Sequence, residues 1–286
     1  MSAPAADFGK LTGMSLYALR DDIEVAAALV KSLGFEAIEI HASQIGPALP
    51  GVPVFEAHAA AVGAVVRNAG LVVSTLNVVG DASFDPFGGP HAFEGTVAGL
   101  ASHLRWAAAM GAPRILIWEG RVSAREDVAP AAKTLARAIE EAKRRSNLAD
   151  LPAVSCELHP FTFALKHRAI AELAAALQSV DAGICFDFCH FAVALGRDLL
   201  PHLDDRLLRS INHIHYADSD VVTSELHFPP SQGVLDLDAI ADRLVGVRAA
   251  AGWDLFGWPG PRQAVRAHMD RYRKFVRRHA GAADPP

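Results

Sequence analysis

Short apolar runs alternate with amphipathic segments of helical spacing from one end of the chain to the other. A strand is predicted for each run, because the runs are short, rich in β-branched residues and bounded by turn residues. The predicted strands are 13–19, 36–41, 71–78, 114–118, 153–157, 183–187, 211–215 and 254–258. Helical patterns lie between them. One begins with a capping box formed by Ser123 and Glu126, and another covers 237–245.

This alternation predicts the fold class. Strands that alternate with helices pair in parallel through crossover connections. Eight such units in about 260 residues favour one (β/α)₈ TIM barrel over a doubly wound sheet. No Gly-x-Gly-x-x-Gly or Walker motif follows a strand, and no linker divides the chain. We therefore expect a single TIM-barrel domain over 1–286, with the barrel at about 11–280 and short flexible termini.

Composition and charge narrow the class of partner. The chain is 51% hydrophobic and carries a net charge of −5, which disfavours a protein that binds nucleic-acid backbones. Its one dense basic cluster, 271–278, is typical of the solvated face of a last helix. No apolar run approaches the roughly 18 residues needed to cross a bilayer. The first ten residues lack the apolar core of a signal peptide, and the three cysteines are too few for a disulfide framework. We expect a cytoplasmic protein with no membrane or nucleic-acid partner.

Acidic and imidazole side chains gather where the predicted strands end. Glu157 precedes Asp187 by 30 residues, and Asp187 precedes His215 by 28, which is about one βα unit each. All three should therefore project into the same mouth of the barrel, where TIM-barrel active sites lie. Two carboxylates and one imidazole suit Mn²⁺, Mg²⁺, Co²⁺ or Zn²⁺.

Structural alternatives exist for these residues. Glu157 could cap a helix, and Asp187 could pair with a loop arginine. Residues His213 and His215 share a strand face, and His213 is expected to be a hydrogen-bonded interior group. Cys156 should face the helices as a small core residue.

Two further groups remain open. Cys185, Cys189, His190 and His215 could form a soft zinc site instead. Glu119, at the end of the fourth strand, could be a helix cap or a substrate contact, and Glu39 has the same two interpretations.

Five short motifs resemble those of the xylose-isomerase-like sugar isomerase/epimerase superfamily, in order and in spacing. They are Glu157-Leu158-His159-Pro160, Asp187-Phe188-Cys189-His190, His213-Ile214-His215-Tyr216-Ala217-Asp218, Ser231-Gln232-Gly233-Val234-Leu235-Asp236 and Gly34-Phe35-Glu36-Ala37-Ile38-Glu39. The resemblance covers nearly the whole chain.

The resemblance implies roles for individual residues. Glu157, Asp187 and His215 correspond to three ligands of one divalent metal ion, and Glu157 is also the expected base. His190 is the expected catalytic and substrate-orienting histidine. His159, in the first motif, is a further expected substrate contact. Asp218 could orient His215 from behind.

This chain departs from the family at its predicted eighth strand. The family has a glutamate there, which is both the fourth ligand and a second catalytic group, whereas this chain reads Leu255-Phe256-Gly257-Trp258-Pro259-Gly260-Pro261-Arg262. A water or Glu119 could complete the coordination, or the metal could be absent. Two-base epimerisation is therefore in question, while one-base isomerisation and elimination are retained. Trp258 could stack on a ring substrate.

The leading hypothesis is a divalent-metal isomerase, epimerase or lyase. Its substrate would be a sugar, polyol or related hydroxy-carbonyl small molecule. The alternative is a metal-free member that binds a sugar-like ligand or catalyses altered chemistry. A third hypothesis comes from DNA-repair endonucleases that share this fold and use three zinc ions, and the acidic charge balance disfavours it. A homo-oligomer is a possible assembly.

Overall fold

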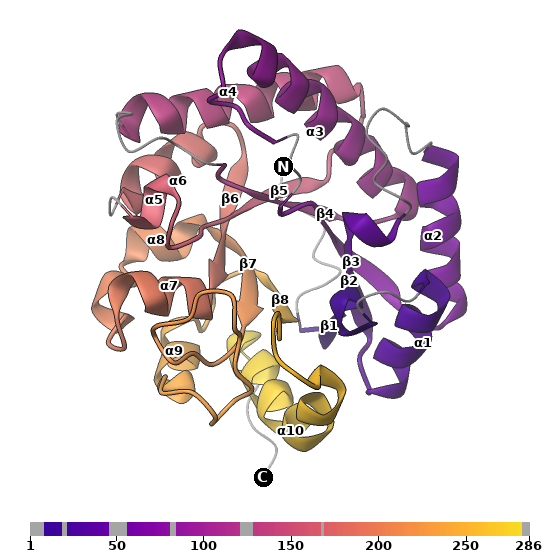
Figure 1. Cartoon of the computed structure of the whole chain (residues 1–286), viewed down its shortest axis with the longest axis vertical. Coiled ribbons are helices and arrows are strands. Elements are labelled where there is room, and N and C mark those ends of the chain that lie inside the picture. Colours follow the sequence, from indigo (N-terminus) through magenta and orange to yellow (C-terminus); the bar gives the residue numbers. More distant parts are fainter. Residues whose placement is uncertain are drawn as a thin grey trace.

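Eight parallel strands close into one barrel in which each strand pairs with the next and β8 pairs with β1 (Figure 1). The structure is a computed structural model, and it describes residues 9–18, 22–45, 56–80, 84–120, 128–166 and 169–281. The strands are β1 (Thr12–Met14), β2 (Ala37–His41), β3 (Val72–Asn77), β4 (Arg114–Trp118), β5 (Ala153–Glu157), β6 (Ala182–Asp187), β7 (Ile211–Tyr216) and β8 (Ala250–Trp253). The predicted (β/α)₈ barrel is confirmed.

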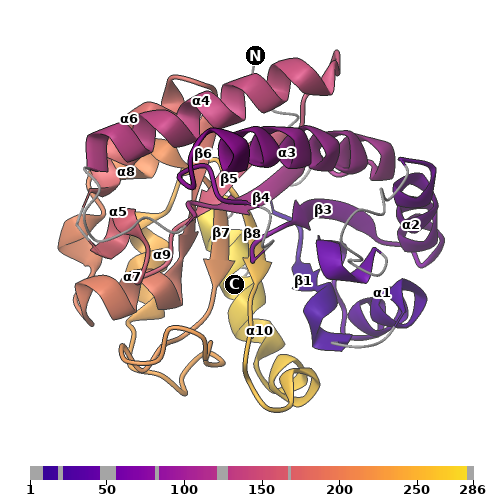
Figure 2. The same cartoon turned by 45° about the horizontal axis from the view of Figure 1, so that its top comes forward.

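Helices surround this barrel on its outside (Figures 1 and 2). They are α1 (Ile23–Ser32), α2 (Glu56–Asn68), α3 (Pro90–Met110), α4 (Val128–Ser146), α5 (Phe163–Lys166), α6 (Ile170–Gln178), α7 (Phe188–Leu195), α8 (Asp205–Ser210), α9 (Leu237–Arg243) and α10 (Pro261–His279), with short 3₁₀ turns at Ser15–Ala18, Ala42–Gln44 and Leu200–His202. The predicted capping box at Ser123 and Glu126 lies outside the described residues. None of the described helices is long and apolar enough to span a bilayer.

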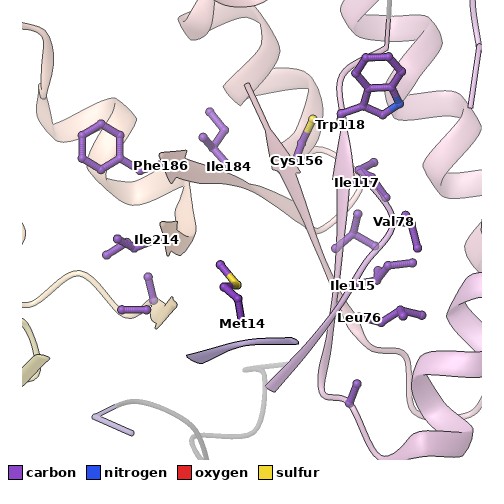
Figure 3. Packing of buried hydrophobic residues seen from close by; sticks show 14 of the residues in the cluster. Met14, Leu76, Val78, Ile115, Ile117, Trp118, Cys156, Ile184, Phe186 and Ile214 are labelled. Carbon is purple, nitrogen blue, oxygen red and sulfur yellow. The ribbon is translucent and has the colours of Figure 1, made fainter. Parts of the chain in front are cut away.

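The alternation of side chains along each strand separates the core from the site. Ile115 and Ile117 are fully buried and lie between β4 and the surrounding helices (Figure 3). Cys156 belongs to the same hydrophobic cluster, which confirms its predicted role as a core residue. Its neighbour Glu157 consequently points into the barrel.

The prediction for the eighth strand was wrong in position. β8 is Ala250–Trp253, and Asp254 follows it instead of starting it. In the run Ala250-Ala251-Gly252-Trp253, the first three residues are small and of low strand propensity, so the composition gives little indication of a strand. Pairing with β7 decides its conformation, since His215 lies opposite Gly252 and Tyr216 opposite Trp253. This shift places a carboxylate at the carboxyl end of the strand.

β1 is also shorter than the predicted run 13–19. Its pairing with β2 covers only Thr12–Met14, after which Ser15–Ala18 turn into a 3₁₀ helix.

Candidate metal centre and active site

A cavity of about 620 Å³ opens at the carboxyl ends of the strands. One part of its wall is polar, with Glu157, His159, His190, His227 and Asp254. The remaining described lining is mostly apolar, with Leu16, Val79, Gly80, Phe84, Trp118, Phe161 and Phe256, and it also includes the polar residues His41, Asn77, Asp85 and Glu225. The cavity thus offers both charged groups and aromatic faces to a small molecule.

The three predicted metal ligands converge, as one-unit spacing around a barrel requires. His215 Nδ1 lies 2.6 Å from Glu157 Oε1 and 3.5 Å from Asp187 Oδ2. All three residues are at least 96% buried. Asp187 also begins α7 directly after β6, because its Oδ1 accepts a hydrogen bond from the backbone N–H of His190 at 2.8 Å. One carboxylate oxygen therefore fixes the helix, and the other faces the centre.

Asp254 is a fourth member of this group, and sequence reasoning missed it. Its Oδ2 lies 3.5 Å from His215 Nδ1, and one ligand atom from each of Glu157, Asp187, His215 and Asp254 lies within 4.8 Å of the others. Its Oδ1 accepts the backbone N–H of Phe256, which holds the turn after β8. The expected gap at strand eight is thus filled by a carboxylate one methylene shorter than the family's glutamate.

The contacts among these atoms fit a cation site. His215 Nδ1 and Asp187 Oδ2 are buried and make no hydrogen bond within the part of the chain that the structure describes. The 2.6 Å approach of His215 Nδ1 to Glu157 Oε1 is likewise not a hydrogen bond in its geometry. Buried polar atoms that converge without partners are costly unless they share an ion. Three carboxylates and an imidazole are ligands for Mn²⁺, Mg²⁺, Co²⁺ or Zn²⁺.

Further imidazoles border this group on the cavity side. His190 and His159 have ring centroids 4.2 Å apart, and His227 lies 5.1 Å from His190. His227 Nδ1 is 3.0 Å from Asp254 Oδ2. Ligand atoms also converge in the sets Glu157–His159–His190 and Asp187–His190–His227, so these residues could hold an ion as well.

The loop after β7 carries the second polar group that sequence reasoning missed. His227 and Glu225 both lie on this loop, and His159 Nδ1 is 3.8 Å from Glu225 Oε1. The available signal was a histidine next to Phe228 and Pro229 in the segment before the Ser231–Asp236 motif.

Charge and burial set the protonation of the central groups. Burial alone raises the pKa of Glu157, but the charges and hydrogen bonds of His215 and His159 together outweigh it and hold that pKa well below its ordinary value. Burial, together with the neighbouring His159 and His227, lowers the pKa of His190 to about 4 against the opposing charge of Asp187. His190 is therefore neutral near pH 7 and can both donate and accept hydrogen bonds.

The structure places two predicted substrate contacts away from the cavity lining. Glu119 is fully buried, and its Oε2 accepts the backbone N–H of Ala164 in the first turn of α5, which matches the helix-cap alternative. Trp258 packs on Phe228, with ring centroids 5.1 Å apart, and lines a smaller crevice beside Tyr17.

Two other sequence hypotheses do not match the contacts. Asp218 accepts hydrogen bonds from the backbone N–H groups of Ser219, Ser231 and Leu235, so it organises the loop after β7. These contacts do not match the hypothesis that Asp218 orients His215. The soft zinc site of Cys185, Cys189, His190 and His215 does not form as one set among the described residues, because Cys185 and His215 converge with His213 instead. Cys189 Sγ lies 3.5 Å from Ser219 Oγ and belongs to none of the convergent groups.

Glu119→Gln is expected to stabilise the fold at high pH and to be neutral at low pH. Burial raises the pKa of Glu119 to about 8 from an ordinary value of 4.5. Because the folded chain holds this proton more tightly, its stability falls as pH rises from about 4.5 to about 8 and then levels off. At about 1.4 kcal/mol per pKa unit, the gain at pH 9 is at most a few kcal/mol.

Thermal unfolding at pH 5 and pH 9 measures this difference. Glu172→Gln, on the exposed surface of α6, is the matched control and should show no such dependence. An equal effect of Glu119→Gln at both pH values would contradict the prediction.

The fold and this site together define a class: a TIM barrel with a carboxylate–imidazole centre at the carboxyl ends of its strands. The xylose isomerase-like TIM barrel family matches residues 27–275, and the chain belongs to this family. This membership confirms the resemblance inferred from the motifs and the expectation of an isomerase/epimerase-like enzyme. No curated protein matches the chain.

Solved structures of low sequence identity share the fold. A putative xylose isomerase from Rhodospirillum rubrum is 19% identical, with a TM-score of 0.70 and coverage of 96% of this chain and 99% of that one. A sugar phosphate isomerase/epimerase from Parabacteroides distasonis is 10% identical, with a TM-score of 0.65 and coverage of 97% of both chains. Endonuclease IV from Thermus thermophilus is 17% identical, with a TM-score of 0.67 and coverage of 93% and 98%.

Proposed function

We propose that the protein is a divalent-metal-dependent isomerase or epimerase, or a related lyase, acting on a sugar, polyol or similar hydroxy-carbonyl compound. The observation that carries this proposal is the convergence of Glu157, Asp187, His215 and Asp254. Two of the four, Glu157 and Asp254, line the cavity. These four residues would hold the ion. When bound there, a divalent ion polarises a carbonyl group and stabilises negative charge on its oxygen.

The chain's own residues would supply the proton chemistry. Glu157 lines the cavity and is ionised near pH 7, so it can take a proton from the carbon next to a carbonyl. Asp254 offers a second carboxylate to the same cavity. Isomerisation results when Glu157 returns the proton to the former carbonyl carbon and the neighbouring hydroxyl proton moves to the carbonyl oxygen. Epimerisation results when Asp254, in its protonated form, delivers a proton to the opposite face of the carbon that Glu157 deprotonated. The presence of Asp254 supports including a two-base mechanism in the proposal, which the lack of a glutamate in the predicted eighth strand had put in question.

Substrate orientation would come from the histidines and the apolar wall. Neutral His190 can hydrogen-bond a substrate hydroxyl, and His159 lies beside it. Trp118, Phe161 and Phe256 line the cavity and can pack on the C–H faces of a carbohydrate. This division suits a compact polyhydroxy carbonyl compound.

The test is a solvent-exchange assay in D₂O with a panel of ketoses, inososes and their phosphates. We expect deuterium at the carbon next to the carbonyl of one substrate class, detected by NMR. Chelation should abolish this exchange, and one of Mn²⁺, Mg²⁺, Co²⁺ or Zn²⁺ should restore it. Exchange that survives chelation would instead support the metal-free alternative.

The same preparation tests the nucleic-acid hypothesis. We expect no cleavage of duplex DNA at an abasic site, since the chain carries a net charge of −5. Cleavage at physiological salt without any exchange in the carbohydrate panel would overturn the proposed function.

A further inference from the structure

Glu39 is a buried carboxylate that no role described so far accounts for. It lies on β2, is 1% exposed, and uses both oxygens. Oε1 accepts a hydrogen bond from Asn77 Nδ2 at 2.8 Å and lies 3.2 Å from His215 Nε2. Oε2 lies 2.9 Å from His213 Nε2. A carboxylate inside a barrel is costly, and these contacts compensate it.

The path from Glu39 to His215 crosses the inside of the barrel. β2 and β7 are separated by β8 and β1 in the closed order of strands. Gly252 of β8 lies opposite His215, and a Cβ atom there would be 3.6 Å from Glu39 Oε2 and 3.3 Å from Met14 Cε. An added Cβ would be in ordinary contact with the carboxylate, so glycine keeps any larger side chain out of the space where Glu39 and His215 meet.

Both partners follow a local shift in strand pairing. Ile38 lies opposite Val73 but Glu39 lies opposite Thr75, so Ser74 is passed over. On the other side, Ile184 pairs with Ile211 and Cys185 with His213, which passes over Asn212. Such irregularities change the direction of the side chains that follow, and they recur beside active sites.

The two nitrogens of His215 face opposite chemistry. Nε2 faces Glu39, whereas Nδ1 faces Glu157, Asp187 and Asp254. A carboxylate acceptor requires a proton on Nε2. In the neutral ring, the lone pair is then on Nδ1, where a cation needs it.

We propose that Glu39 is a positioning residue that fixes the tautomer and the orientation of His215 for metal binding. The inference rests on the metal-dependent function proposed above. It gives Glu39 the role of orienting His215, which the sequence had suggested for Asp218. Asn77 supports it, because its Nδ2 donates to Glu39 while its Oδ1 accepts the backbone N–H of Val79. Since Asn77 also lines the cavity, this chain of contacts joins the cavity wall to the metal centre.

The test is the affinity of Glu39→Gln for Mn²⁺, measured by calorimetry. Glutamine keeps the shape but replaces one acceptor oxygen by an amide NH₂, which cannot accept from an imidazole N–H. We expect Kd to rise by about 10- to 100-fold, the usual effect of losing such an outer partner. The visible spectrum of the Co²⁺-loaded variant should change as well, because the imidazole is reoriented.

His213→Gln is the matched control, because it removes the other imidazole from the same carboxylate and leaves the Glu39–His215 contact. We expect its Kd for Mn²⁺ to change less than about threefold, with an unchanged Co²⁺ spectrum. The melting temperature of each metal-free variant checks that both remain folded. A folded Glu39→Asp variant, which keeps the charge but shortens the reach, should recover part of the affinity lost in Glu39→Gln.

The outcomes separate this inference from the proposed function. If the unmutated protein binds Mn²⁺ and Glu39→Gln binds it equally well, the positioning role is refuted and the proposed function stands. If His213→Gln weakens binding as much as Glu39→Gln, Glu39 acts on general packing and the inference is also refuted. If the unmutated protein binds neither Mn²⁺ nor Co²⁺, the metal-dependent function fails, and the positioning role fails with it.

Discussion

Asp187→Ala is expected to abolish turnover, with a loss of at least about 10³-fold in kcat/KM. Asp187 contributes one of the convergent ligand atoms, and its other oxygen caps α7 next to His190. The metal's contribution to the stabilisation of charge in the transition state is several kcal/mol, and about 4 kcal/mol corresponds to 10³-fold. The deuterium-exchange assay measures the loss directly, and added Mn²⁺ should raise the activity of the unmutated protein.

Asp270→Ala provides the control for this substitution. Asp270 lies on α10 with its side chain 97% exposed, so the same change there should leave exchange intact. Asp187→Asn separates the two functions of the residue, because an amide oxygen can still cap α7 while the negative charge is gone. Turnover that persists in both Asp187 variants and after chelation would mean that the metal hypothesis is wrong.

Asp254→Asn carries the second large effect. The substitution removes a buried negative charge but keeps the oxygen that accepts the N–H of Phe256, so the turn after β8 should persist. Breaking a buried charge pair by removing one partner costs about 3–5 kcal/mol. We therefore expect metal affinity to fall by about 10²- to 10³-fold, measured by calorimetry with Mn²⁺, and turnover to fall with it.

Asp254→Glu tests the same position from the other side. It replaces the aspartate by the longer carboxylate that the family carries after its eighth strand, and we expect it to retain metal binding. Wild-type affinity and turnover in Asp254→Asn would show instead that three protein ligands suffice, as the misplaced strand had suggested.

The repeating pattern of the sequence predicted the barrel, because strand and helix periods are local properties of the chain. Strands β4 and β5 were predicted with their observed bounds, since Arg114–Trp118 and Ala153–Glu157 are apolar runs between clear helices. The convergence of Glu157, Asp187 and His215 followed from the spacing of one βα unit. Each residue ends a strand or lies one position before its end, and those ends meet at one face of a barrel.

The eighth strand could not be found in the same way. Ala250–Trp253 is short, three of its four residues are small, and its conformation is imposed by pairing with β7 and β1. The prediction began the strand four residues too late and placed Asp254 at its start, so this candidate ligand was missed. Local composition carries little information about a short strand whose conformation is imposed by its neighbours.

By itself, the sequence determined the fold class, the family, and the three ligand candidates that lie at or next to the ends of consecutive strands. Only the tertiary structure decided the contacts between residues far apart in the chain. It brought Asp254 and His227 into contact beside the candidate metal ligands. It also placed Glu39 against His215, 176 residues away in the chain, and Glu119 against the first turn of α5. The physical reason is that periodicity and spacing report which face of an element a residue occupies. Which partner it meets there depends on barrel closure, on local shifts in strand pairing and on the path of the loops.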